Sequence, residues 1–244
     1  MAALGFPHKG KCNAPLDPVR NDSSVTEWPR SRTDLIALQE RLGSVRRPPL
    51  WSPSGEIRLG GCFVCFARGG SGPGAAGDAA WAAAVSGAGS SVVSGSAGAP
   101  YEPGMLALRE GALLEQALRG LERRPEVLLV DATGRDHPRR AGLALHLGVV
   151  LDLPTVGVTH RPLVASGTWP GDERGDTSPL RIGTEVVGHW LRTRPGTRPL
   201  AVHAGWRIDP DLAVEVVLRS LRWTRTPDPI RRARRLARTA RARG

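Results

Sequence analysis

Residues 126–158 form the stretch that most constrains what this chain can fold into. The stretch opens with an uninterrupted run of apolar residues at 127–130, which is typical of a parallel strand buried on both faces. A second apolar segment, 143–150, predicts a helix, and Pro154 ends it before another short apolar run at 155–158. The sequence therefore predicts a β-loop-α-loop-β unit and an α/β fold.

Asp131 directly follows the first of these strands and is a candidate site residue. Open α/β sheets bind their ligands at the carboxyl ends of the strands, although a carboxylate there can also be an ordinary polar strand end. Asp136 lies in the following loop, before Pro138, which suits a first helical turn. We predict that Asp136 either caps that helix or swings toward the sheet edge as a further site carboxylate.

Length, charge and cysteine content limit the class of protein. The 244 residues are 40% hydrophobic, which is enough for one α/β core. The net charge of +11 favours a polyanionic partner, although a genome with biased composition would give a similar excess of arginine. Three cysteines exclude a disulfide framework and favour a reducing cytoplasm. Because no apolar run is long enough, we expect neither a membrane span nor a signal peptide.

The remaining elements follow from periodicity and from turn residues. Residues 1–31 lack sustained periodicity and are predicted to be a mobile tail before a domain at 32–228. Strands are expected at 57–66, 79–85, 92–93, 185–191 and 198–202, helices at 33–42, 105–121 and 210–221, and loops at 69–77 and 161–178. Residues 229–244 form a basic helix or tail, which is either a frayed, solvated end or an arm that follows phosphates.

Seven short motifs in this chain resemble those of the endonuclease V family in their order and approximate spacing. They are Tyr101-Glu102-Pro103-Gly104, Arg109-Glu110, Asp131-Ala132-Thr133-Gly134, His137-Pro138-Arg139-Arg140, Pro154-Thr155-Val156-Gly157-Val158, Leu191-Arg192-Thr193-Arg194 and Pro227-Asp228-Pro229-Ile230-Arg231. The resemblance covers residues 33–236. It implies a ribonuclease H-like mixed sheet, in which three antiparallel strands are extended by parallel strands and helices cover both faces.

The resemblance also implies an activity, namely metal-dependent cleavage of DNA at the second phosphodiester bond 3′ to deoxyinosine, as part of DNA repair. Glu110 and Asp131 match the family's metal ligands, and His137 would assist near the scissile phosphate. The implied cofactor is Mg²⁺ or Mn²⁺, which takes oxygen ligands, activates water and neutralises charge on the phosphorus. We expect the protein to be a monomer that binds DNA, with RNA as the alternative partner. We do not expect it to bind a membrane.

A wedge and a pocket for the damaged nucleotide follow from the same resemblance. Tyr101, Pro103 and Gly104 match the wedge, in which a ring replaces lost base stacking and a stiff, low backbone approaches the strand closely. Tyr101 is the single tyrosine of the chain, and the alternative is that it is a half-buried turn aromatic. The implied pocket wall consists of Gly104, Leu106, Leu143 and Gly157.

Three site positions depart from the family pattern. Phe63 stands where the family has its first metal-binding Asp, and no Asp or Glu occurs at 57–77 to replace it. His160 stands in place of a Lys and Trp206 in place of a His. Because fewer anionic oxygens weaken a metal site, we expect reduced cleavage, and the alternative is an inactive nucleic-acid-binding homologue.

Cys62 and Cys65 form a C-x-x-C sequence in the strand that contains Phe63. Alternate residues of a strand point to opposite faces, so positions i and i+3 do not share a face. The spacing therefore favours two buried structural cysteines over a zinc pair or a redox pair.

Overall fold

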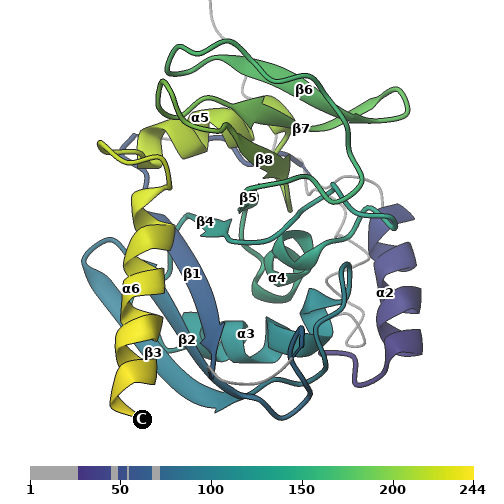
Figure 1. Ribbon diagram of the computed structural model, residues 1–244, viewed down its shortest axis with the longest axis vertical. Coiled ribbons are helices and arrows are strands. Elements are labelled where there is room, and N and C mark those ends of the chain that lie inside the picture. The colour runs from purple at the N-terminus through teal and green to yellow at the C-terminus, as the bar shows by residue number, and fades with distance from the viewer. Residues whose placement is uncertain (1–26, 45–48, 54, 68–71) are drawn as a thin grey trace, which may run out of the picture.

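The computed structural model describes residues 27–44, 49–53, 55–67 and 72–244. Its centre is a mixed sheet of eight strands in the order β3-β2-β1-β4-β5-β8-β7-β6 (Figure 1). The strands are β1 (Leu59–Phe66), β2 (Ala79–Ser86), β3 (Gly89–Ser96), β4 (Val127–Val130), β5 (Thr155–Thr159), β6 (Thr177–Ile182), β7 (Glu185–Leu191) and β8 (Leu200–Ala204).

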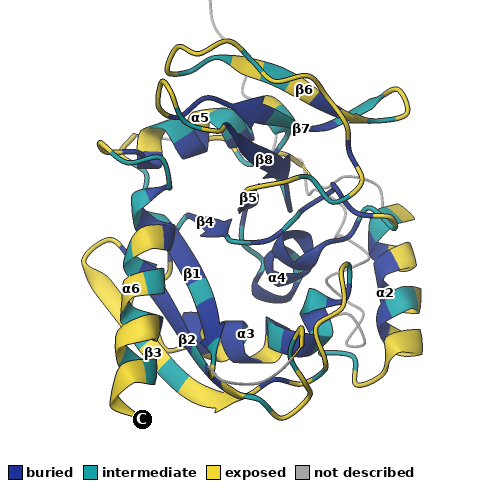
Figure 2. Cartoon of the chain, in the orientation of Figure 1, coloured by how far each residue is buried: buried dark blue, intermediate teal, exposed yellow. Residues whose placement is uncertain are grey.

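Helices cover both faces of this sheet. They are α2 (Arg32–Ser44), the π-helical turn η1 (Ala107–Gly111), α3 (Ala112–Arg119), α4 (Leu143–Leu151), α5 (Pro210–Ser220) and α6 (Asp228–Arg243). One core cluster joins η1, α3 and α4 to β1, β2 and β4, and another joins α5 and the start of α6 to β4, β5, β7 and β8. Buried residues accordingly line both sides of the central strands, while α6 exposes its outer side (Figure 2).

The predicted α/β fold and its mixed sheet are confirmed. Strands β1, β2 and β3 form an antiparallel meander, and β1, β4 and β5 run parallel. Every residue of β4 is buried, as the uninterrupted apolar run at 127–130 predicts. The sheet continues through β8, β7 and β6, all antiparallel to their neighbours.

Strand β6 begins within the last two residues of the predicted loop at 161–178 and continues through residues for which the sequence predicts no element. It lies at the edge of the sheet, and Leu180 is its single fully buried residue. Pro179 at its centre is tolerated because an edge strand leaves one row of backbone groups unpaired. The weak apolar pattern of an exposed edge strand explains why periodicity missed it.

Two further predictions need correction. The helix after Asp131 begins at Leu143, so Pro138 is not in its first turn and Asp136 does not cap it. Trp28 belongs to the folded domain although we assigned it to the tail, because its indole donates to Glu115 at 2.6 Å and its ring lies 4.4 Å from that of His146. Residues 1–26 of the predicted tail and 68–71 of the predicted loop lie outside the described residues.

Helix α6 packs directly on β1 at a glycine. A Cβ atom on Gly61 would lie 2.5 Å from the carbonyl carbon of Pro229, at the start of α6, so any larger residue would push the helix away from the sheet. The two cysteines of β1 confirm the predicted alternation, because Cys62 packs in the core on the α3 side and Cys65 packs against Ala237 of α6.

Within the described ranges, no helix is long and apolar enough to cross a membrane.

Candidate nucleic-acid site

A cavity of about 830 Å³ opens beside β1 and β4 and contains both predicted metal ligands. Its lining includes Glu110 from the π-helical turn, Asp131 from the end of β4, and Cys62 and Phe63 from β1. Cys62 pairs with Val130 in the parallel register, which places Phe63 opposite Asp131. The structure therefore brings Phe63, Glu110 and Asp131 together at one sheet edge, as the motifs predict.

Glu110 lies in an environment that disfavours its charge. The pKa of its carboxyl is raised to about 8, chiefly by burial and also by the negative charge of Asp131, while the charge of Arg109 opposes the shift. The Arg109 guanidinium itself is held elsewhere, by Asp78 at 3.0 Å and by the carbonyl of Ala99 at 2.7 Å. Glu110 is therefore largely protonated at neutral pH.

The raised pKa of Glu110 predicts a pH-dependent stability. The carboxyl keeps its proton to about pH 8 in the folded chain but only to about pH 4.5 when unfolded, so stability falls as pH rises between these values. Glu110→Gln is expected to remove this loss and to melt higher than wild type at pH 9 but not at pH 5. A gain of 1 kcal/mol would raise Tm by about 2–4 °C. Thermal melts of both proteins at the two pH values measure it.

The exposed Glu122 is a matched control for this prediction. Glu122→Gln makes the same chemical change outside the cavity and should leave the difference between pH 5 and pH 9 as it is in wild type. If Glu110→Gln and wild type lost stability in parallel as the pH rose, the assigned protonation of Glu110 would be wrong.

Asp131 is already paired with a cation of the chain. Arg234 of α6 donates from Nη2 to Oδ2 of Asp131 at 2.8 Å. The same guanidinium lies over the ring of Phe63, with its Cζ 4.9 Å from the ring centroid. Phe63 therefore lies close to Asp131, with its ring against α6, and Arg234 bridges the two residues.

These residues do not fit a Mg²⁺ ion as they stand. The described residues contain no group of three or more His, Cys, Asp or Glu side chains that could hold a metal. Of the two carboxyl groups present, Glu110 is largely protonated and Asp131 is occupied by Arg234. Mg²⁺ requires several hard, anionic oxygen ligands, which this arrangement does not offer.

A smaller cavity of about 260 Å³ adjoins the first and shares Tyr101, Asp131 and Leu143 with it. Its lining contains most of the predicted wedge and pocket residues, namely Tyr101, Pro103, Gly104, Leu106 and Leu143, and also His137, which was predicted to assist catalysis. Gly157, which we expected in its wall, is not in this lining. A Cβ atom there would lie 2.4 Å from the carbonyl oxygen of Ala132, so Gly157 serves the close approach of β5 to the chain after β4.

His137 holds the turn that carries Tyr101. Its Nε2 lies 3.0 Å from the carbonyl oxygen of Gly104, and its Nδ1 accepts from the backbone of Arg139 at 3.1 Å. Burial lowers the pKa of the imidazole, which suits a neutral ring that donates at Nε2 and accepts at Nδ1. Both nitrogens are engaged, so this geometry gives His137 a positioning role and does not support the predicted role beside a scissile phosphate.

Gln39 of α2 is a site residue that the motifs did not reveal. Its amide donates to the carbonyl of Gly104 at 2.9 Å and accepts from Arg139 at 2.7 Å. Gly104 itself has φ +80°, a left-handed conformation that glycine adopts without strain. Residues from two distant segments, α2 and the loop at 137–139, therefore fix the backbone of the 101–104 turn, a convergence that no local pattern signals.

Asp136 is fixed in place and does not reach the sheet edge. Its buried carboxylate accepts from the backbone amides of Leu163, Val164 and Ala165 at 2.6, 2.9 and 2.7 Å. The predicted swing toward the metal ligands is therefore wrong, because three backbone donors hold it. Asp136 instead positions the loop that carries Leu163 into the lining of the smaller cavity.

The two other substituted positions have different surroundings. His160 is exposed, and its Nδ1 lies 3.0 Å from Nη1 of Arg225. Partial desolvation of the ring lowers the pKa of its imidazole, the charge of Arg225 lowers it further, and Asp131 opposes the shift. Trp206 is buried and packs where a Cβ on Gly148 would meet it, so it belongs to the core rather than to either cavity.

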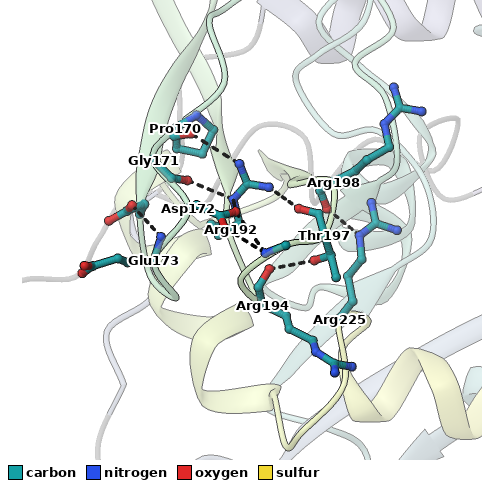
Figure 3. Close-up of polar contacts among 11 residues, drawn as sticks. Pro170, Gly171, Asp172, Glu173, Arg192, Arg194, Thr197, Arg198 and Arg225 are labelled. Atoms are coloured by element: carbon teal, nitrogen blue, oxygen red, sulfur yellow. Dashed lines mark hydrogen bonds and ion pairs between the residues drawn. The ribbon is translucent and has the colours of Figure 1, made fainter.

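Arginines also order the loops beside β7 and β8 (Figure 3). Arg192 bonds the carbonyls of Gly171 and Thr197 and pairs with Asp172 at 3.2 Å. Arg225 donates to the carbonyls of Arg198 and Pro199. In this region the family motif at 191–194 has a structural role, because the Arg192 head group satisfies loop carbonyls instead of facing solvent.

Comparison with known proteins agrees with the motifs. The family model described as Endonuclease V matches residues 74–235. The endonuclease V of Methanopyrus kandleri is 47% identical over 147 residues, which cover 60% of this chain and 63% of that protein. The endonuclease V of Xanthomonas axonopodis pv. citri is 44% identical over 138 residues, which cover 57% and 58% respectively. The aligned part therefore spans about three fifths of these relatives.

Solved structures of the same family share the fold. The endonuclease V of Streptomyces avermitilis superimposes with a TM-score of 0.77 at 34% identity, covering 88% of this chain and 95% of that chain. The catalytic domain of human endonuclease V superimposes with a TM-score of 0.72 at 30% sequence identity, and the match covers 86% of this chain and 97% of that domain. Since the family model alone spans more than half of the residues, the chain belongs to the endonuclease V family.

Proposed function

We propose that this protein binds inosine-containing nucleic acid through the turn at 101–104 and the smaller cavity, and that its metal-dependent cleavage is lost or strongly reduced. The observation that carries the proposal is the pairing of Asp131 with Arg234 beside an intact pocket. The residues that we propose for recognition line one cavity, while the carboxylate that would serve a metal is paired with Arg234.

The binding half of the proposal rests on the wedge and on the pocket behind it. Tyr101 is 45% exposed at the rim, so its ring is free to stack on a base. Behind it, a cavity of about 260 Å³ has apolar walls at Leu106 and Leu143 and polar groups at Asp131 and Thr133. An endonuclease V from Ciona intestinalis with the same fold is known in complex with a 24mer DNA containing an inosine.

Reduced cleavage follows from the charges at the sheet edge. Cleavage of the family type needs a cation held by carboxylates to activate water and neutralise the phosphate. Phe63 supplies no oxygen, and Arg234 already neutralises Asp131. A residual Mg²⁺- or Mn²⁺-dependent endonuclease is the second candidate, favoured by one observation: Glu110 and Asp131 still line the same cavity.

One experiment separates the two candidates. Purified protein is incubated with a labelled inosine-containing duplex, with and without Mg²⁺ or Mn²⁺, and both binding and strand nicking are followed. We expect binding that discriminates inosine from adenine, with little or no nicking. Metal-dependent nicking 3′ to the inosine that Asp131→Ala abolishes would favour the nuclease instead, and equal binding of both duplexes would contradict the proposal.

Tyr101→Ala tests the wedge directly. Since base stacking on an aromatic ring contributes about 1–3 kcal/mol, the substitution is expected to weaken binding of the inosine-containing duplex by that amount and binding of the undamaged duplex by less. Titrations by fluorescence anisotropy measure both. Tyr101→Phe keeps the ring and should bind as wild type does, and Trp223→Ala removes an aromatic that is 89% exposed elsewhere. Equal losses on the two duplexes would leave Tyr101 with a structural role only.

A further inference from the structure

Helix α6 carries a stripe of arginines that runs past Asp131. Arg231, Arg234, Arg235 and Arg238 are spaced i, i+3, i+4 and i+7, which places them on one side of the helix. A groove of about 720 Å³ follows this side and is lined by these four residues together with Arg232 and Arg243. The groove therefore contains six arginines, of which Arg231 pairs with Asp228 and Arg234 with Asp131.

Two of these guanidinium groups share one support. The Cζ atoms of Arg234 and Arg238 lie 4.9 and 6.0 Å from the centroid of the Phe63 ring. Planar guanidinium groups stack on aromatic faces, so the ring that replaces the family's carboxylate holds two cations in position. The Phe63 ring thus positions the guanidinium groups of Arg234 and Arg238 at the sheet edge, where the family pattern has its first metal-binding Asp.

The hydrogen-bonding capacity of these groups is not used up. Arg234 gives one Nη2 donor to Asp131, and its Nε is buried without a partner. Within the described residues, no carboxylate pairs with Arg238. One negative charge on Asp131 therefore faces two positive charges, and free N–H groups remain for an anion.

We propose that Arg234 and Arg238 bind a backbone phosphate of nucleic acid at the edge beside Asp131, with guanidinium groups in place of the family's metal ion. A cluster of carboxylates repels a phosphate until a cation neutralises it, whereas this cluster already contains its cations. The inference rests on the proposed binding of nucleic acid and specifies its phosphate contact. Binding to the duplex is accordingly independent of divalent metal.

The test compares duplex binding in EDTA and in Mg²⁺ at constant ionic strength. We expect wild-type affinity to be the same in both. Arg234→Gln is expected to weaken binding of inosine-containing and undamaged duplex alike by about tenfold, and to reduce the slope of log K against log salt by about one. Arg238→Gln should act in the same direction, and Arg234→Lys should recover the salt slope because it keeps the charge.

Arg219→Gln is the matched control. This arginine lies on α5, is exposed and pairs with Glu215, so its loss makes the same change in net charge away from Asp131. The inference would be overturned if wild-type protein needed Mg²⁺ to bind the duplex or did not bind it in EDTA. It would also be overturned if Arg234→Gln and Arg219→Gln weakened binding equally. The ratio of affinities for inosine-containing and undamaged duplex tests the proposed function separately, because a phosphate contact leaves that ratio unchanged.

Discussion

Replacing Asp136 with alanine is expected to lower the free energy of unfolding by about 3–5 kcal/mol, because each buried donor that loses its partner costs about 1–3 kcal/mol and three donors are affected. Asp136 is fully buried, and its carboxylate is the acceptor for three consecutive backbone amides at 163–165. Alanine would leave these donors buried and without a partner. The loop at 163–165, which contributes Leu163 to the lining of the smaller cavity, would therefore lose the hydrogen bonds that hold it in place.

Urea denaturation of wild type and variant measures this loss as a shift in midpoint at unchanged slope. Asp136→Asn keeps part of the accepting capacity and should give a smaller loss. Asp172 also accepts a backbone N–H, from Gly196 at 3.0 Å, but it is 63% exposed, so water replaces it and Asp172→Ala should cost much less. If Asp136→Ala and Asp172→Ala lowered the free energy of unfolding equally, the three buried hydrogen bonds of Asp136 would contribute no more to stability than an exposed one.

The double variant Phe63→Asp/Arg234→Gln is expected to create a metal site that the natural chain lacks. Phe63 lies opposite Asp131 in the register of β1 and β4, so an Asp there adds a carboxylate to Glu110 and Asp131. Removing Arg234 frees Asp131 from its present partner. The new carboxylate and Asp131 then repel one another until a divalent cation binds them together with Glu110, so Mg²⁺ or Mn²⁺ should stabilise the variant.

The size of this stabilisation follows from linkage: at a metal concentration one hundred times Kd it is about 2.7 kcal/mol. Thermal melts with and without metal, together with calorimetric titration, measure it. Phe63→Leu/Arg234→Gln is the matched control, because it removes the same ring and the same cation but adds no oxygen. Phe63→Asp alone should respond less, since the new carboxylate can pair with Arg234. Metal stabilisation of the control as well would refute the placement of Phe63.

The sequence by itself determined the central part of the fold. The sequence predicts the two strands at 127–130 and 155–158 and the helix between them from local patterns. In each segment, the spacing of apolar residues and the breaking residues that flank it are enough to identify the element. The position of Asp131 at a strand end followed from the same pattern. The ordered motifs then placed Glu110, Tyr101 and Phe63 with Asp131 around one sheet edge, and the structure brings them to the same cavity.

Only the tertiary structure decided which groups neutralise this edge. Arg234 follows Asp131 by 103 residues, and nothing in the pattern of α6 distinguishes it from its neighbouring arginines. Its contact depends on how closely α6 docks on β1, which is set by the missing side chain of Gly61. Likewise, Asp136 meets amides 27 to 29 residues away. Ion pairs and buried hydrogen bonds depend on distances of a few ångströms between segments that are far apart in the chain, and these distances exist only once the core has packed.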